Sequence, residues 1–285
     1  MLKRLIPTAA LAMALSVSAM PPAEAITVND ILRGAAIAAQ GFFISEADEI
    51  ALGQATATQV MQQMPRTKDA ALEAYVTRVG RAVAAQSERP KLPYQFFVLE
   101  SSELNAFAAP GGFIFVTTGL LRFMGEEAQL AGVLGHEVAH VAKKHSVKAI
   151  RKAMVAQGVA TATLGDNPSQ LTAIGANIAA TLILKGFDRK AELEADHVGA
   201  GYSFRAGYDP KSLVRFLDAL GKASGEPPDW LMAVANHPKS ADRVVRLNQH
   251  LTSPAFRATR PLLTNREIYQ REVRARLGPA PAKAS

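Results

Sequence analysis

The chain has 285 residues, no cysteine and a formal net charge of +7 at pH 7. Its length allows one substantial apolar core, and the lack of cysteine excludes disulfides and a bacterial lipoprotein anchor. Because the basic residues are scattered and no aromatic-basic stripe stands out, we predict no nucleic-acid binding. Weak peripheral contact with an anionic membrane surface explains the charge better, and the absence of any functional role explains it almost as well.

The first 25 residues have the pattern of a secretory signal peptide. Lys3 and Arg4 precede an apolar stretch, and residues 23–25 read Ala-Glu-Ala, the small-residue form of a cleavage site. A membrane anchor is the alternative, but the apolar stretch contains a proline and is shorter than the roughly 20 residues of a span. We therefore expect export. Residues 26–44 have no firm period and form either a docking arm or a membrane-touching segment.

The rest of the chain is predicted to be α+β and mostly α-helical, with one small β-sheet. Ser45 and Asp48 form a capping-box pattern at the start of a helix that runs to about Gln63. Residues 94–99 and 112–117 have strand composition. Further helices are expected at about 68–87, 126–145, 187–206, 210–222 and 239–251, followed within 256–285 by a C-terminal helix and a disordered tail.

Residues 135–140 read Gly-His-Glu-Val-Ala-His on the predicted helix 126–145. Because an α-helix turns about 100° per residue, His136 and His140 lie one turn apart on one face and can bind one Zn²⁺. Glu137 beside them can act as general base on a water held by that metal. A surface helix carrying these residues by chance is the alternative, but an apolar stripe at helical spacing indicates a buried helix. The motif therefore predicts metal-assisted hydrolysis, most often of a peptide bond.

The predicted helix 187–206 supplies a candidate third ligand. The chain lacks the downstream glycine and histidine of metzincins, so that class is excluded. Glu192 and Asp196 are four residues apart and share a face, whereas Glu194 points elsewhere. We expect Glu192 to bind the metal and Asp196 to accept the other ring N–H of a ligating histidine. An ordinary salt-bridged helix is the alternative, and it explains Glu194 but not Asp196.

Small residues predict that the two metal-bearing helices pack closely. Gly132 and Gly135 lower the helix propensity of the first helix, which suggests that another element approaches it closely. Gly199 has no side chain and so allows the second helix to pack closely on that face. His145 lies about 140° around the first helix from His140, so we interpret it as structural. His197 and His250 give no functional signal.

Residues 153–184, between the two metal-bearing helices, are the most ambiguous part of the chain. They are rich in Ala, Ile, Leu and Thr, and residues 165–169 split them into two pieces. Neither piece reaches the length of a membrane span. Two packed helices are the favoured interpretation, and a mobile lid over the metal site is the alternative.

Taken in order, the motifs resemble a known family. The matching stretches are residues 105–121, 135–140 and 192–196, the turn at 207–210, and His237-Pro238 with Arg243. Over roughly residues 45–250 the sequence is similar to the gluzincin metalloendopeptidase family that contains the CaaX prenyl protease, HtpX and the Oma-type peptidases. It looks closest to the periplasmic BepA-like and LoiP-like members, without the transmembrane helices of HtpX or the repeat domain of BepA.

The resemblance implies a zincin-like zinc metallopeptidase domain at 45–255, in the periplasm of a Gram-negative bacterium. It implies that His237 lies near the metal, where it either stabilises the oxyanion or occupies the open coordination position, with Arg243 in support of the ligands. It also implies an exposed strand edge that holds substrate by main-chain hydrogen bonds, a buried core strand being the alternative. The residues of that edge are Phe113, Ile114, Phe115 and Val116.

We therefore predict a zinc-dependent endopeptidase of the bacterial cell envelope, with one Zn²⁺ per chain and Glu137 as general base. Its substrates would be unfolded or misassembled envelope proteins. Two other classes remain open. One is a periplasmic chaperone or outer-membrane assembly factor with a structural zinc site, and the other is a membrane-associated scaffold that uses residues 26–44 and 153–184.

Overall fold

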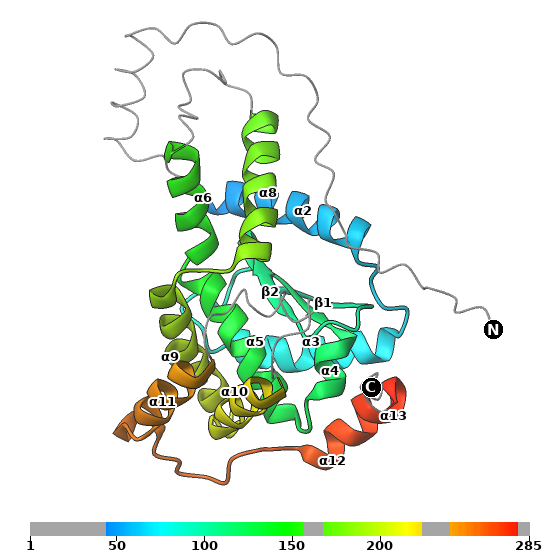
Figure 1. Cartoon of the computed structure of the whole chain (residues 1–285), viewed down its shortest axis with the longest axis vertical. Helices are drawn as coiled ribbons and strands as arrows, with labels where there is room; N and C mark the ends of the chain where they lie inside the picture. Colours follow the sequence, from blue (N-terminus) through cyan, green and yellow to red (C-terminus); the bar gives the residue numbers. More distant parts are fainter. Residues whose placement is uncertain (1–43, 157–167, 224–239, 279–285) are drawn as a thin grey trace, which may run out of the picture.

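The computed structural model describes residues 44–156, 168–223 and 240–278. The predicted signal peptide, almost all of the predicted arm, His237 and the last residues of the tail lie outside this part of the chain. Within it, a small β-sheet lies among helices, and the helix that carries the H-E-x-x-H motif runs through the centre (Figure 1).

The sheet has three strands in the spatial order β1-β3-β2. These are β1 at Gln95–Leu99, β2 at Ala106–Ala109 and β3 at Phe113–Thr117. β1 runs parallel to β3, and β2 runs antiparallel to it. β1 and β3 lie where strands were predicted. β2 was not predicted, because its sequence Ala-Phe-Ala-Ala is short and alanine has low β-propensity.

The prediction that Phe113, Ile114, Phe115 and Val116 form an exposed, substrate-binding edge is wrong. β3, which contains them, is the central strand, paired with β1 on one side and β2 on the other. All of its residues are buried. A strand whose two sides are already paired has no backbone groups left for a substrate. Strand composition identifies a strand but does not give its position in the sheet.

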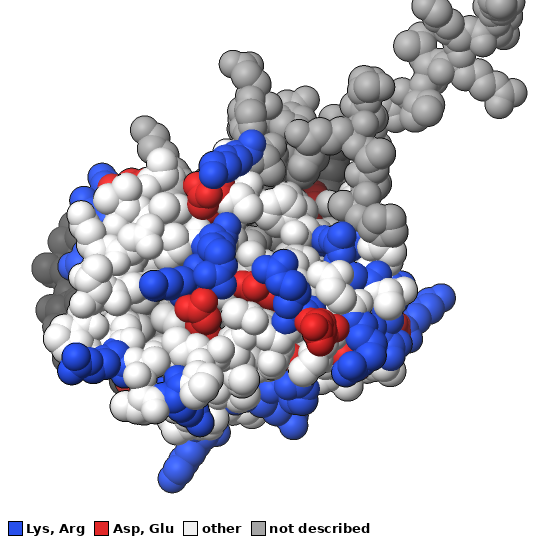
Figure 2. Space-filling view, turned by 90° about the horizontal axis from the view of Figure 1, so that it is seen from below, with Lys and Arg blue, Asp and Glu red and all other residues white. Residues whose placement is uncertain are grey.

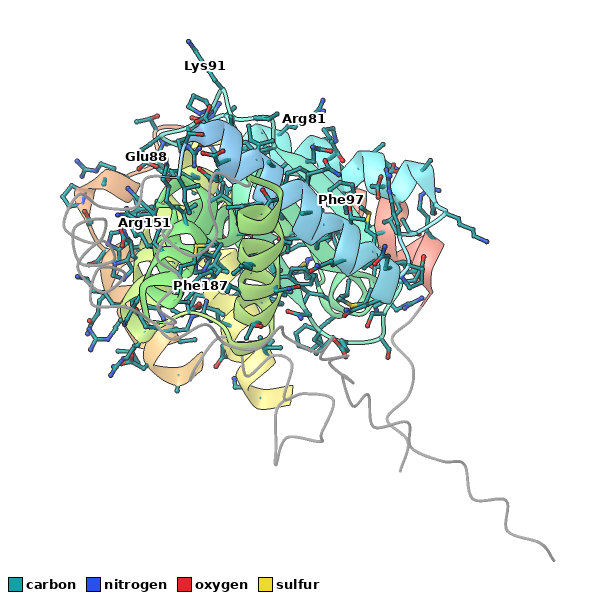
Figure 3. The ribbon with its side chains drawn as sticks, turned by 90° about the horizontal axis from the view of Figure 1, so that it is seen from above. Arg81, Glu88, Lys91, Phe97, Arg151 and Phe187 are labelled. Carbon is teal, nitrogen blue, oxygen red and sulfur yellow. The ribbon has the colours of Figure 1, made fainter. Side chains whose placement is uncertain are left out.

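Successive side chains of each strand point to opposite faces of the sheet, and helices cover both faces. One face packs on α3 (Ala70–Ala84) and α5 (Glu127–Ala142), and the other packs on α2 (Glu46–Gln63). On the α2 face, stacked phenylalanine rings fill the space between the strands and the helix; Phe97 in Figure 3 is one of them. The sheet therefore forms a packed support behind α5.

The other helices are α4 (Thr118–Phe123), α6 (His145–Ala156), α8 (Pro168–Lys185), α9 (Arg189–Arg205), α10 (Lys211–Ala223), α11 (Ser240–Leu251), α12 (Arg266–Tyr269) and α13 (Ala275–Leu277), with short turns of 3-10 or π-helix at Pro110–Gly112, Pro254–Phe256 and Gln270–Arg274. Of these, α9, α10 and α11 match the prediction to within a few residues, whereas α4 was not predicted and α6 begins before the predicted insert. Ser45 and Asp48 form the predicted capping box at the start of α2.

The predicted helix 126–145 is broken near its end. α5 ends at Ala142, and α6 begins at His145. Between them Lys144 has φ of +56°, a left-handed conformation that costs a residue with a side chain about 1–2 kcal/mol. No glycine marks the break in the sequence. Because of it, His145 does not lie 140° around one continuous helix but turns back toward His140.

The described parts of the 153–184 insert are helices packed on the rest of the domain. α6 and α8 share an apolar cluster with α2 that includes Leu52, Ile150 and Ile178. These contacts fit the packed-helix interpretation, while residues 157–167 lie outside the described part. No helix in residues 44–156, 168–223 and 240–278 has the length and apolar character needed to cross a membrane.

α5 and α9 approach each other at two glycines, as the sequence predicts. A Cβ on Gly199 would lie 2.6 Å from the carbonyl carbon of Gly135 and 2.6 Å from the amide nitrogen of His136. Real Cβ atoms do not come so close to backbone, so only glycine permits this approach. The contact places the face of α9 that carries Glu192 against the histidines of α5.

Alanine at Gly199 is expected to push α9 away from α5 and to destabilise the fold by about 1–3 kcal/mol, measured by urea unfolding. The matched control is Gly201→Ala on the same helix, where the new Cβ would meet only the end of the flexible Arg205 side chain, at 3.2 Å. That variant should be neutral or slightly stabilised, since alanine favours helix. Equal stability of the two variants would contradict the importance of the close contact.

Candidate metal centre

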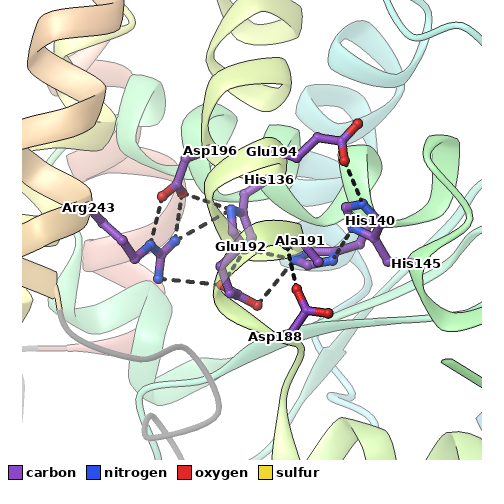
Figure 4. Close-up of polar contacts among 9 residues, drawn as sticks. All are labelled: His136, His140, His145, Asp188, Ala191, Glu192, Glu194, Asp196 and Arg243. Carbon is purple, nitrogen blue, oxygen red and sulfur yellow. Dashed lines mark hydrogen bonds and ion pairs between the residues drawn. The ribbon is translucent and has the colours of Figure 1, made fainter.

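His136 and His140 on α5 and Glu192 on α9 converge on one point in the interior. The Nε2 atoms of the two histidines are 3.0 Å apart. The carboxylate oxygens of Glu192 lie 3.4 Å from Nε2 of His136 and 3.6 Å from Nε2 of His140. All three residues are buried, and one donor atom from each lies within 4.8 Å of the others. Figure 4 shows the three side chains meeting between the helices.

The chemistry of these donors fits a zinc ion. Two imidazole nitrogens with one carboxylate form the donor set of catalytic zinc sites that keep a fourth position for water or substrate. Burial alone would lower the pKa of His136, but hydrogen bonds with Asp196 and Glu192 outweigh it and raise the pKa to about 9. The carboxylates of Asp196 and Glu192 therefore favour a positive charge at this position, and a divalent metal ion would supply one.

Asp196 lies where the sequence predicts it, against the far side of His136. Its Oδ1 is 2.9 Å from Nδ1 of His136, so it can accept the Nδ1–H and leave Nε2 for the metal. Arg243 on α11 donates to Asp196 from Nε at 2.7 Å and from Nη2 at 2.6 Å, and its Nη1 is 3.7 Å from Glu192. Burial would raise the pKa of Asp196, but Arg243 and His136 hold it well below its ordinary range.

His145, interpreted from the sequence as structural, contacts the metal-centre histidine directly. Its Nδ1 lies 2.9 Å from Nδ1 of His140, and its Nε2 lies 3.4 Å from Oε2 of Glu194. Phe187, labelled in Figure 3, stacks its ring on that of His140 with centroids 4.3 Å apart. Sequence reasoning missed His145 because it assumed an unbroken helix, and missed Phe187 because the short α8–α9 connection carries no recognisable signal.

Glu137 is buried beside the cluster and opens onto a cavity. It lines this cavity together with His136, Arg243 and residues of β2, α4, α5 and α10. Most of the wall is apolar; the apolar residues are Leu104, Ala106, Leu120, Val133, Leu213, Phe216, Leu217 and Leu220. A substrate side chain entering here would sit next to the Glu137 carboxylate.

The other histidines that the sequence analysis considered are His237, His197 and His250. His237 lies outside the described residues, and its proposed role near the metal stays a prediction. The rings of His197 and His250 stack on each other with centroids 4.2 Å apart, joining α9 to α11. Neither belongs to the metal-ligating group found among the described residues.

The surface seen in Figure 2 carries Lys and Arg side chains with Asp and Glu among them. On this face the basic side chains are interrupted by acidic ones. Elsewhere, the buried Glu126 pairs with Arg215 and Arg266.

An H-E-x-x-H helix beside a small sheet, with a glutamate brought in by a second helix, defines a zincin-like fold. The family model agrees with this class. Peptidase family M48 matches residues 70–251, a range that includes both metal-bearing helices, the sheet and Arg243. The chain belongs to this family.

Similar proteins are found in bacteria and in mitochondria. The chain is 29% identical over 225 residues to the beta-barrel assembly-enhancing protease of Escherichia coli (strain K12), a match covering 73% of this chain and 46% of that protein. It is 32% identical over 200 residues to the mitochondrial metalloendopeptidase OMA1 of Schizosaccharomyces pombe, covering 66% and 58% of the two chains. The chain thus spans about half the length of these curated relatives.

Proposed function

We propose that this chain is a zinc-dependent metalloendopeptidase. The observation that carries the proposal is the convergence of His136, His140 and Glu192 in one buried cluster, with Glu137 on the same helix facing a cavity. Membership of a peptidase family supports hydrolysis of a peptide bond over other metal-assisted reactions.

His136 and His140 would hold the zinc through Nε2, and Glu192 through its carboxylate. When bound, zinc supplies Lewis acidity, which lowers the pKa of water and polarises a carbonyl. Glu137 takes the proton from the attacking water on its carboxylate and returns it to the leaving amine. Asp196 holds the Nδ1 proton of His136, and Arg243 fixes Asp196 in place. Burial of these residues excludes bulk water and strengthens each of their interactions.

The outer side of β2 is the better candidate for binding the substrate backbone. β2 pairs with β3 on one side, and within the described residues no strand pairs with its other side. Ala106 of β2 and the preceding Asn105 line the same cavity as Glu137. An extended peptide added along β2 would be held by main-chain hydrogen bonds with little regard to sequence, which suits an enzyme that acts on many unfolded chains.

We further propose that the enzyme works in the cell envelope, in the periplasm of a Gram-negative bacterium, on misfolded or misassembled proteins. The signal-like pattern of residues 1–25 supports export. Similarity to a protease named for beta-barrel assembly supports a substrate among envelope proteins. The alternative is a periplasmic chaperone or outer-membrane assembly factor with a structural zinc site.

Metal removal tests the proposed activity. Zinc-loaded protein is expected to degrade casein, to lose this activity in a strong zinc chelator, and to regain it when zinc is restored. His140→Ala should lose both zinc and cleavage, because it removes one of three ligands, whereas His250→Ala, outside the cluster, should keep both. Cleavage by the chelated protein or by His140→Ala would show that the metal cluster is not the active site.

A further inference from the structure

The two histidines of the metal cluster have different partners behind them. His136 faces a carboxylate, with Asp196 Oδ1 2.9 Å from its Nδ1. His140 faces another histidine, with Nδ1 of His145 2.9 Å from its own Nδ1. The other ring nitrogen of His145, Nε2, lies 3.4 Å from Oε2 of Glu194. In Figure 4 these contacts form a line from Glu194 through His145 to His140.

The positions of the atoms assign the protons along this line. His140 presents Nε2 to the cluster, so a neutral His140 that ligates a metal must carry its proton on Nδ1. That proton needs an acceptor, and Nδ1 of His145 lies at hydrogen-bond distance, 2.9 Å from Nδ1 of His140. His145 then carries its own proton on Nε2, where it faces Glu194. One tautomer of each ring satisfies both contacts.

We propose that His145 is a positioning residue for His140, and that Glu194 holds His145 in the tautomer this requires. The proposal rests on the metal site of the proposed function and extends it. His145 accepts the Nδ1–H of His140, fixes the orientation of its ring and keeps Nε2 unprotonated and directed at the metal. Glu194 lies on the face of α9 away from Glu192 and Asp196, where it is half-exposed. Through His145 it nevertheless contributes to the orientation of His140.

Local structure supports a role beyond filling space. His145 is 5% exposed, and it reaches His140 only because the helix breaks at Lys144 in a left-handed conformation. Phe187 stacks on the face of the His140 ring, with centroids 4.3 Å apart, and its centroid lies 6.0 Å from that of His145. The His140 ring is therefore held both by an aromatic face and by a hydrogen-bond acceptor. A neutral acceptor in place of a carboxylate leaves His140 less electron-rich than His136.

The decisive comparison is His145→Phe with His145→Asn. Phenylalanine keeps a flat ring but offers no acceptor, whereas asparagine keeps an oxygen at the δ position. Loss of such a partner weakens metal affinity by about 10–100-fold, so His145→Phe should raise the zinc Kd by that factor, measured by competition with a chromophoric chelator. His145→Asn should stay within about threefold of the unaltered protein. The Co²⁺-substituted protein should show altered visible bands in His145→Phe and near-normal bands in His145→Asn.

Three further measurements keep the result interpretable. His250→Phe makes the same chemical change in a stacked histidine outside the cluster and should leave the zinc Kd and the Co²⁺ spectrum unchanged. Circular dichroism checks folding, and if His145→Phe does not fold, His145→Ala replaces it as the variant without an acceptor. Glu194→Ala should weaken zinc binding less than His145→Phe, because it acts one contact further away.

An unchanged zinc Kd and Co²⁺ spectrum in a folded variant without the acceptor would overturn the proposal. So would a His145→Asn variant as impaired as His145→Phe, since that would indicate a packing role. Both outcomes are measured by metal binding, so they do not depend on whether the protein cleaves casein. Zinc binding without casein cleavage in the unaltered chain would sink the peptidase function while leaving the positioning role of His145 measurable.

Discussion

Replacing Glu137 with glutamine is expected to lower the rate of casein cleavage by about 10²–10⁴-fold, the usual contribution of a general base, while zinc stays bound. Glutamine has the size of glutamate but cannot take a proton from the attacking water. Zinc should remain because Glu137 does not belong to the ligating group of His136, His140 and Glu192. The measurement is cleavage rate beside zinc content per chain. Glu267→Gln, the same change at an exposed position, is the control and should cleave normally.

The outcome separates the two functional classes. Zinc bound and cleavage lost would assign the base. Zinc bound and cleavage retained would show that Glu137 is not the general base. Complementation of a deletion strain by Glu137→Gln would show that the cell needs binding or assembly and not hydrolysis. Failure to complement, with the variant present at normal abundance, would favour the peptidase.

The metal-binding face could be predicted from sequence because it depends on helical periodicity alone. Spacing places His136 and His140 on one side of α5, and the same rule selects Glu192 and Asp196 over Glu194. The distances among these residues agree with that selection. Gly135 was also informative, because a glycine inside a helix is costly unless another backbone comes close.

The features that escaped prediction depend on tertiary structure. Composition marked β3 as a strand, but its central position results from pairing with β2, a segment too short and alanine-rich to be recognised. The break at Lys144 has no glycine or proline to announce it. As a result, the contact of His145 with His140 and the stacking of Phe187 could be found only once the chain was folded.

The second large effect is expected at the ion pair of Asp196 with Arg243. Both residues are buried, at 0% and 6% exposed, and two hydrogen bonds of 2.6 and 2.7 Å join them. Asp196→Asn would leave the Arg243 guanidinium buried without its main counter-charge. Breaking a buried pair from one side costs about 3–5 kcal/mol, so we expect a loss of that size in urea unfolding of the chelated protein. Zinc affinity should fall by about 10–100-fold as well.

Arg243→Met should cost less stability than Asp196→Asn, because Asp196 would keep His136 as a partner, whose raised pKa allows it to carry the compensating charge. The double variant should be more stable than the sum of the two losses predicts, since it leaves neither charge unpaired. Asp242→Asn, in the exposed pair with Arg189, is the control and should change little. Losses that add to within about 0.5 kcal/mol would mean that Asp196 and Arg243 do not act as one unit. Arg243 would then support the site by packing, and Asp196 by its bond to His136 alone.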